Sequence, residues 1–272
     1  MYGKSFIYDG RSSEDFNLMI AGIKVVDIPL NMERNIEVSD MNKYRHRVNV
    51  YGVNYKSTLS FTIQLIKNVC NIDEAEDMKF TRQELRRITA WLTSPITPRL
   101  FHMYDYEEGQ TEYDYYGLFT NIEAEDNSPH SLTCTFECNT PYALSSEQTY
   151  TINDAVGIVS NLSDEYEDYV YPVITITPTI SGNHSITLRN LTDGNRHFTI
   201  KNMQLGNPVV IDCQKMTIKD KYNTLISFED LEIDEQDYIY WFRLARGDNR
   251  VTVTNNAIVE FKFRYPVKVG AF

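Results

Sequence analysis

Residues 57–66 read STLSFTIQLI, and the alternation in this stretch decides the fold class. From Leu59 to Leu65, every second side chain is large and apolar, and the side chains between them are small or polar. This pattern is typical of a strand in an antiparallel sheet with one buried and one solvated face. The predicted buried positions here are Leu59, Phe61, Ile63 and Leu65. The sequence therefore predicts an all-β protein.

The same alternation returns along the rest of the chain. It appears as Ile174/Ile176 (continuing through Pro178 to Ile180), Ile186/Leu188, Phe198/Ile200, Val251/Val253 and Val259/Phe261/Phe263/Tyr265. A hairpin is predicted from residues 100–107 (LFHMYDYE) and 112–125 (EYDYYGLFTNIEAE) around a turn near Gly109, followed by a strand at 131–139. At the C-terminus, strands on either side of Asn255-Asn256 predict a final hairpin.

One segment predicts a helix within this β-rich chain. Residues 81–95 read TRQELRRITAWLTSP, with Thr81 and Glu84 at the spacing of a capping box. Apolar side chains recur at helical spacing, namely Leu85, Ile88, Trp91 and Leu92. Pro95 and Pro98 are expected to end the helix.

Two domains are predicted, at 1–146 and 147–272. Pro141 and the polar run SSEQ interrupt the strand pattern near residues 143–150. The second segment has many short strands and turn signals, which indicates a β-sandwich or jelly roll. The acidic run SDEYEDY at 163–169 is either a linking strand or an exposed loop.

Charge and composition exclude several classes of protein. The chain carries 26 basic and 38 acidic residues, a net charge of −12, which disfavours sequence-independent binding to nucleic acid phosphates. An apolar stretch of about 18 residues is missing, so membrane insertion is not expected. The opening MYGKSFIYDG does not resemble a signal peptide. Reduced, buried thiols are predicted for the four cysteines, Cys70, Cys134, Cys138 and Cys213.

The residues that could carry chemistry form no recognisable site. The five histidines (46, 102, 130, 184, 197) have no Cys or carboxylate partner at metal-ligand spacing, so neither a metal nor a cofactor is predicted. Gly3-Lys4-Ser5 lacks the upstream glycine of a phosphate loop. Arg246-Gly247-Asp248 spells an integrin-type tripeptide but is interpreted as part of a tight turn. Acid pairs such as Asp105/Glu107 and Asp234/Asp237 are expected by chance in an acidic protein, and no catalytic residues are predicted.

Several segments together resemble the distal tail protein family of long-tailed phages. They are 6–20 (FIYDGRSSEDFNLMI), 136–145 (FECNTPYALS), 188–200 (LRNLTDGNRHFTI), 206–218 (GNPVVIDCQKMTI), 238–253 (YIYWFRLARGDNRVTV) and 242–272. The resemblance implies a ring-forming β-sandwich-type N-terminal domain and a galectin-like C-terminal domain. It also implies a homohexameric ring that joins the tail tube, built from the major tail protein, to the tail-associated hub or lysin protein. Larger members hold carbohydrate-binding insertions, for which this chain is too short.

The resemblance further implies a virion protein of the tail tip or baseplate, made in the bacterial cytoplasm, with DNA passing through the lumen of the ring. In some members the outer domains carry receptor-binding proteins. We hypothesise that acidic side chains line this lumen and repel the passing DNA. An origin in a phage, a prophage or a tail-like bacteriocin stays open.

Aromatic and basic residues of the first domain are the candidates for the interface between subunits. Tyr side chains are enriched in interfaces, and in the family a long hairpin from the region 44–66 reaches the next subunit. The candidates are Tyr44, Arg45, Arg47, Tyr51, Tyr55, Lys56, Tyr104, Tyr106, Tyr113 and Tyr115. For the tyrosines of 104–116, which include Tyr116, an equal alternative is that they alternate along strands and that half of them belong to the core. Exposure to solvent explains the basic residues nearly as well as an interface does.

Two other functions remain as alternatives. One is a monomeric carbohydrate-binding module that presents Tyr240 or Trp241 to a host glycan. The other is a glycoside hydrolase, which requires a cleft that shifts carboxylate pKa values.

Overall fold

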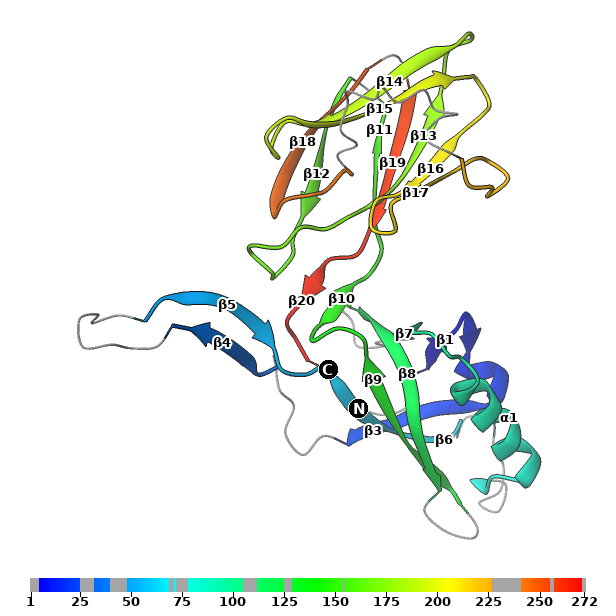
Figure 1. Cartoon of the computed structure of the whole chain (residues 1–272). Helices are drawn as coiled ribbons and strands as arrows, with labels where there is room; N and C mark the ends of the chain where they lie inside the picture. The colour runs from blue at the N-terminus through cyan, green and yellow to red at the C-terminus, as the bar shows by residue number, and fades with distance from the viewer. Residues whose placement is uncertain are drawn as a thin grey trace. The chain divides into compact units, whose positions relative to one another are not determined.

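The computed structural model describes residues 5–24, 32–39, 48–68, 71, 78–104, 112–124, 129–153, 155–226, 241–254 and 257–270. They form β-strands with a single α-helix, as the alternation and the capping box predicted. The chain divides into two compact units (Figure 1). The first comprises Met1–Leu144 with Lys268–Phe272, and the second comprises Ser145–Val267. The roles given to domains 1–146 and 147–272 stay predictions.

The first unit is built on one curled sheet with the strand order β2-β1-β7-β8-β9-β6-β3. Its strands are β1 (Phe6–Tyr8), β2 (Arg11–Ser12), β3 (Leu18–Lys24), β6 (Ser60–Lys67), β7 (Arg99–Met103), β8 (Tyr113–Ala124) and β9 (Ser131–Cys138). A 3-10 helix, η1 (Ser13–Phe16), precedes β3, and α1 (Arg82–Thr93) precedes β7. Two short strands, β10 (Ala143–Ser145) and β20 (Pro266–Val267), lie where the chain leaves this unit and returns to it.

A single apolar core fills the first unit, and the predicted alternation supplies much of it. The four residues of 57–66 predicted to be buried are buried, as are Tyr8, Phe101 and Phe136 from other strands. Phe101 and Phe136 lie 4.9 Å apart between ring centroids. The turn at Asp9-Gly10 has positive φ at both residues (50° and 74°), which suits the tight connection between β1 and β2.

Helix α1 has the capping box that the sequence predicted. Glu84 N–H donates to Thr81 Oγ1 (3.3 Å), and Thr81 N–H donates to Glu84 Oε2 (2.7 Å). Ile88, Trp91 and Leu92 are buried, and the Trp91 indole N–H donates to the Tyr8 carbonyl at 3.2 Å. The helix is therefore held against the sheet by an apolar stripe and one buried hydrogen bond.

The cap gives a direct test of how much α1 contributes to stability. Thr81→Ala removes one half of the capping box and is expected to lower the free energy of unfolding by about 1 kcal/mol. Urea denaturation followed by tryptophan fluorescence measures this change. Thr89→Ala on the exposed side of the same helix is the matched control and should not destabilise the protein. An equal loss in both variants would contradict the role of the cap.

The second unit is a β-sandwich of two antiparallel sheets. One sheet has the order β11-β19-β13-β16-β17 and the other the order β12-β18-β14-β15. The strands are β11 (Gln148–Ile152), β12 (Val156–Asn161), β13 (Val173–Pro178), β14 (His184–Asn190), β15 (Arg196–Met203), β16 (Val209–Asp212), β17 (Thr217–Lys219), β18 (Gly247–Val253) and β19 (Ala257–Phe263). Their buried alternate residues form a separate core between the sheets.

The final hairpin predicted from the sequence is wrong. β18 pairs with β12 and β14, whereas β19 pairs with β11 and β13 in the opposite sheet. Both strands have alternating apolar residues because each has one side facing the sandwich core. Between them the chain crosses from one sheet to the other, where a hairpin was expected. The predicted turn residues Asn255 and Asn256 lie outside the described residues.

Two further details refine the sequence-based predictions. β13 ends at Pro178, so Ile180 is not part of it, and the acidic run 163–169 forms no strand after β12. Cys134, Cys138 and Cys213 are free and buried, as predicted, and burial raises the pKa of each thiol to about 12. Cys70 lies outside the described residues.

Candidate assembly interface

An exposed hairpin, β4 (Arg34–Val38) with β5 (Val50–Tyr55), departs from the packing of the first unit. Its two strands pair with each other and form a sheet of their own, separate from the curled sheet. Figure 1 shows this hairpin, called the arm below, apart from the curled sheet. All five residues of β4 are exposed. The arm therefore lacks the apolar support that the other strands of the unit receive.

The arm has one apolar and one polar face. Ile36 lies opposite Val53, and Val38 lies opposite Val50 across a register shift between Glu37 and Val38, where β5 has one extra residue. Directly opposed residues of an antiparallel pair project to the same side, as do residues two apart on one strand. These four side chains therefore share a face, and they are 57%, 46%, 49% and 59% exposed in the order named.

Polar groups occupy the other face of the arm. Asn35 lies opposite Asn54, and Glu37 lies opposite Gly52. Asn54 Nδ2 donates to Glu37 Oε1 at 2.8 Å across the strands. Because the side chains of this face are polar, the apolar face is the part of the arm that requires a cover.

The base of the arm is attached to the first unit. Tyr55 packs against the core, and its ring lies 6.3 Å from that of Tyr142 in an edge-on contact. Lys56 N–H donates to the Glu33 carbonyl at 2.9 Å, and the two side chains form an ion pair. Met32, just before β4, is buried in the same core. The arm thus begins and ends at a fixed position on its own subunit.

The structure distributes the predicted interface residues among different environments. Tyr44, Arg45, Arg47 and Tyr106 lie outside the described residues. Tyr51 is exposed on the arm, whereas Tyr55 is partly buried at its base and Lys56 pairs with Glu33 of the same chain.

Two tyrosines of β8, on the same side of the strand, pack in or against the core. Tyr115 is 1% exposed and donates its hydroxyl to the Gly270 carbonyl at 3.1 Å, so its ring is not presented at the surface. Tyr113 is partly buried against the same core. Sequence reasoning did not single out the apolar residues of the arm, although RNIEV at 34–38 contains an alternation that could have indicated them.

A histidine between two carboxylates lies at the end of the β7–β8 hairpin. His102 Nδ1 and Asp114 Oδ1 are 2.6 Å apart, and His102 Nε2 and Glu112 Oε2 are 3.2 Å apart. The Tyr104 ring contacts the imidazole edge-on at 4.8 Å between centroids. The hydrogen bond to Asp114 raises the pKa of His102, while partial burial opposes that shift.

This cluster predicts a pH-dependent contribution to the stability of the first unit. Because the pKa of His102 is higher in the folded than in the unfolded state, the contribution is complete below about 6.5, the ordinary pKa of histidine, and is lost as the pH rises through the raised folded pKa. Urea midpoints measured across this pH range should fall in the wild type and should fall less in His102→Gln. Asp114→Asn should flatten the dependence as well. An unchanged pH slope in both variants would contradict the assignment.

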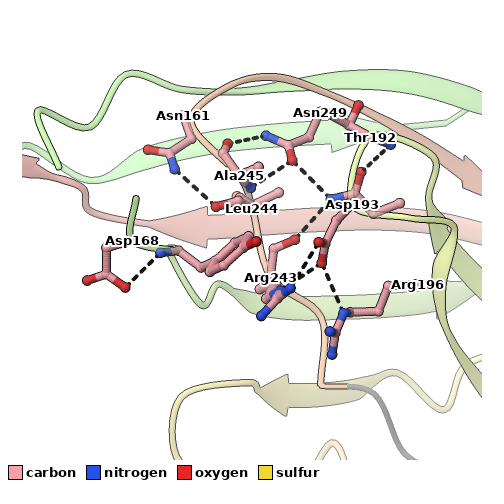
Figure 2. A network of polar contacts seen from close by, with 11 residues as sticks. Asn161, Asp168, Thr192, Asp193, Arg196, Arg243, Leu244, Ala245 and Asn249 are labelled. Atoms are coloured by element: carbon pink, nitrogen blue, oxygen red, sulfur yellow. Dashed lines mark hydrogen bonds and ion pairs between the residues drawn. The ribbon is translucent and has the colours of Figure 1, made fainter. Parts of the chain in front are cut away.

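In the second unit, a polar network holds the segment that leads into β18 (Figure 2). Asp193 accepts hydrogen bonds from Arg243 Nε (2.8 Å) and Nη2 (3.1 Å) and pairs with Arg196 Nε at 3.0 Å. The Arg243 guanidinium lies 3.5 Å from the Tyr169 ring centroid. The bonds from Arg243 hold the pKa of Asp193 below its ordinary value. The arrangement is a structural ion pair, since each charged group already has its partners.

The integrin-type tripeptide is also occupied by internal contacts. Arg246 Nε donates to the Ser163 carbonyl at 2.9 Å, and its guanidinium lies 3.7 Å from the Tyr166 ring centroid. Asp248 accepts a hydrogen bond from the Ser160 hydroxyl at 2.6 Å. Gly247 has φ = 89°, in the region that favours glycine, but it is the first residue of β18 and pairs with Asn161, so a strand begins where a tight turn was predicted.

Neither a metal centre nor a membrane span is found in the described parts of the chain. The described residues contain no group of three or more His, Cys, Asp or Glu that could hold a metal ion. Their helices include none that is long and apolar enough to cross a membrane. Trp241 is half-buried against the second core, 6.0 Å from Phe198 between ring centroids, and Tyr240 lies outside the described residues.

Comparison with known protein families identifies the chain. Residues 1–140 match the model of a phage tail protein N-terminal domain, and residues 139–263 match that of a phage tail C-terminal domain. The chain belongs to this phage tail protein family. Among curated proteins, none is similar enough in sequence to match it.

Solved structures of phage tail proteins share the fold. The Dit protein of phage SPP1, described as a paradigm of the hub adsorption apparatus in phages that infect Gram-positive bacteria, has a TM-score of 0.63 and 14% identity. That match covers 96% of this chain and 99% of the other. A chain of the phage P2 baseplate in its activated conformation with calcium has a TM-score of 0.60 and 10% identity, covering 98% and 99%. The same baseplate with strontium gives 0.60 and 11%, covering 97% and 99%.

The resemblance that the sequence suggested is thereby confirmed. The β-rich fold class with one helix is also confirmed, because the similarity to Dit extends over nearly the whole length of both chains. As a member of a phage tail protein family, the chain has a structural role in a phage tail as its coarse function.

Proposed function

We propose that this tail protein is a distal tail component that closes into a ring of six copies. The observation that carries the proposal is the apolar face of the arm. A two-stranded hairpin is marginally stable in water, and a monomeric protein rarely exposes a contiguous apolar surface without a binding role. Ile36, Val38, Val50 and Val53 form such a surface on a hairpin whose base is fixed on its own subunit.

The geometry of the arm favours a neighbouring copy as its cover. An arm that leaves its own subunit and packs on a different surface of the next one makes a head-to-tail contact, and repetition of that contact closes a ring when the rotation allows it. Completing the burial of four half-exposed side chains contributes roughly 3–6 kcal/mol per contact. Such a contact also covers the open edges of β4 and β5.

The partners follow from this role. The ring joins the tail tube, made of the major tail protein, to the tail-associated hub or lysin protein, and the second unit offers a surface for a receptor-binding protein. The similarity to Dit and to baseplate chains supports a position at the tail tip of the virion. The protein acts by shape and assembly, without catalysis or cofactor.

Purified tails provide the test of the ring. Quantitative mass spectrometry should find six copies of the chain in each tail, and averaged particle images should show a ring at the tip. A single copy per tail would contradict the proposal. Light scattering of the isolated protein at increasing concentration then shows whether the ring forms without its tail neighbours.

The net charge of −12 further supports an acidic lumen. Carboxylates around the channel would repel DNA phosphates over about 8–10 Å at physiological salt, which keeps the passing DNA from binding the wall. A map of the assembled ring tests this directly. A lumen lined by Lys and Arg would show the idea to be wrong.

A further inference from the structure

An edge strand of the second unit leaves backbone hydrogen-bonding groups open. Among the described strands, β12 is the first of the sheet β12-β18-β14-β15 and pairs with β18 alone. Val156 and Ile158 on this strand are 45% and 60% exposed, whereas Val159 and Asn161 face the core and are fully buried. β12 thus presents apolar side chains at an open edge.

The register shows which backbone groups point away from the sheet. Val253 N–H donates to the Ala155 carbonyl at 2.9 Å, so the pair 155/253 is a hydrogen-bonded pair. Such pairs alternate along antiparallel strands. The N–H and C=O groups of residues 157, 159 and 161 therefore point toward β18, and those of Val156, Ile158 and Ser160 point outward.

Only part of this edge is covered within the described residues. The outward carbonyl of Ser160 accepts a hydrogen bond from the Tyr150 hydroxyl at 3.2 Å. The outward groups of Val156 and Ile158 have no such partner among the described residues. Two residues in extended conformation therefore offer two donors and two acceptors to an incoming strand.

The edge also lacks the features that usually prevent strand addition. Natural edges are protected by charged side chains, proline or bulges. The sequence of β12 is VGIVSN, without charge or proline, and its pairing with β18 has no bulge. At the opposite edge of the same sheet, β15 carries Arg196 and Lys201, and its pairing with β14 is irregular. The contrast marks β12 as the edge that is open to a partner.

The outward face of this sheet is basic in an otherwise acidic protein. Arg250 lies opposite Ile158, Arg189 lies opposite Thr252 on the next strand, and His197 lies opposite Arg189. Neither arginine side chain has an ion-pair partner among the described residues. Among the described residues of this face, Asp248 carries the carboxylate, which accepts a hydrogen bond from Ser160.

We propose that β12 binds an extended acidic segment of another protein, which adds a strand to this sheet. The segment pairs with the outward groups of Val156 and Ile158, and its carboxylates lie above the sheet within reach of Arg250. The backbone of the added strand would lie two inter-strand spacings, about 9–10 Å, from the backbone of Arg250. Two long side chains can bridge this distance. This is the strand-addition mode of peptide recognition.

Charge selects this partner over a second copy of the chain. Two copies joined through their β12 edges would place Arg250 and Arg189 of both on one continuous sheet with no added acid. Like charges on one face are unfavourable, whereas an acidic strand neutralises the face. The proposal concerns the second unit and does not depend on the closure of the ring.

Synthetic peptides test the site on the full chain. A valine–glutamate alternating peptide of about eight residues is compared with its valine–lysine counterpart, and amide hydrogen exchange of β12 is followed by NMR. The acidic peptide at saturation should slow exchange at Val156 and Ile158 by at least about tenfold. The basic peptide should have no such effect.

Two variants separate backbone pairing from charge. Ile158→Pro removes one outward donor and leaves the bonds to β18 intact, so it should abolish the protection. Arg250→Glu should lower the affinity for the acidic peptide about three- to tenfold and create binding of the basic one. Arg82→Glu in the first unit adds the same charge and serves as the matched control, with wild-type binding expected.

Each contrary result would overturn the proposal. Unchanged exchange at Val156 and Ile158 with the acidic peptide would exclude strand addition at this edge. Equal binding of both peptides, or an Arg250→Glu variant that behaves as Arg82→Glu does, would exclude recognition of acidic charge. Protection that rises with protein concentration in the absence of peptide would show that a second copy occupies the edge.

Discussion

Ile36→Asp on the arm is expected to prevent ring assembly while leaving the subunit folded. Ile36 is 57% exposed in the subunit, so a carboxylate there remains in water and costs the monomer little. In the ring the same carboxylate would enter an apolar contact, where an unpaired charge costs several kcal/mol. The affinity between subunits should fall by at least about a hundredfold, and the deficit recurs at every contact around the ring.

The polar face of the arm provides the matched control. Asn35→Asp adds the same charge to the same strand, one residue away, on the side that faces solvent. Both variants should have the melting temperature of the wild type. Only Ile36→Asp should remain unassembled, measured by native mass spectrometry of protein coexpressed with its tail neighbours. Assembly of both variants, or of neither, would argue against the apolar face as the contact.

The arm also shows where prediction from sequence reaches its limit. In the stretch 59–65, which includes most of β6, the alternation predicted burial correctly, because Leu59, Phe61, Ile63 and Leu65 meet apolar residues of the same chain. The alternation in RNIEV has the same form, yet its apolar residues are exposed. Periodicity shows that a strand has two faces, but it cannot show whether the apolar face is covered by its own subunit or by another one.

Contacts between residues on neighbouring strands are a second feature that the sequence did not predict. The spacing of residues along the sequence did not predict a carboxylate partner for His102. In the structure, Asp114 lies directly opposite it on the neighbouring strand. Twelve residues separate the two, and the register of the β7–β8 hairpin alone brings them to 2.6 Å. The helix, in contrast, was predictable because a capping box and an apolar stripe are local patterns within one turn or a few.

Asn249 connects the polar network of the second unit, and its removal should have the largest effect on stability. The residue is fully buried. Its Oδ1 accepts from Ala245 N–H (2.9 Å) and from Asn190 Nδ2 (3.0 Å), and its Nδ2 donates to the carbonyls of Ala245 (2.7 Å) and Gly247 (3.1 Å). The side chain thereby fixes the loop that Figure 2 shows ahead of β18.

Asn249→Ala leaves several buried donors and acceptors without partners, and each costs about 1–3 kcal/mol. The free energy of unfolding of the second unit should fall by roughly 3–5 kcal/mol, measured by urea denaturation and by hydrogen exchange at β14 and β18. Asn249→Asp keeps the acceptor but loses the donor and buries a charge, so it should be at least as damaging. Asn183→Ala, at an exposed asparagine of the same unit, should cost little. If Asn249→Asp were as stable as the wild type, the donated bonds to Ala245 and Gly247 would not be what holds the loop.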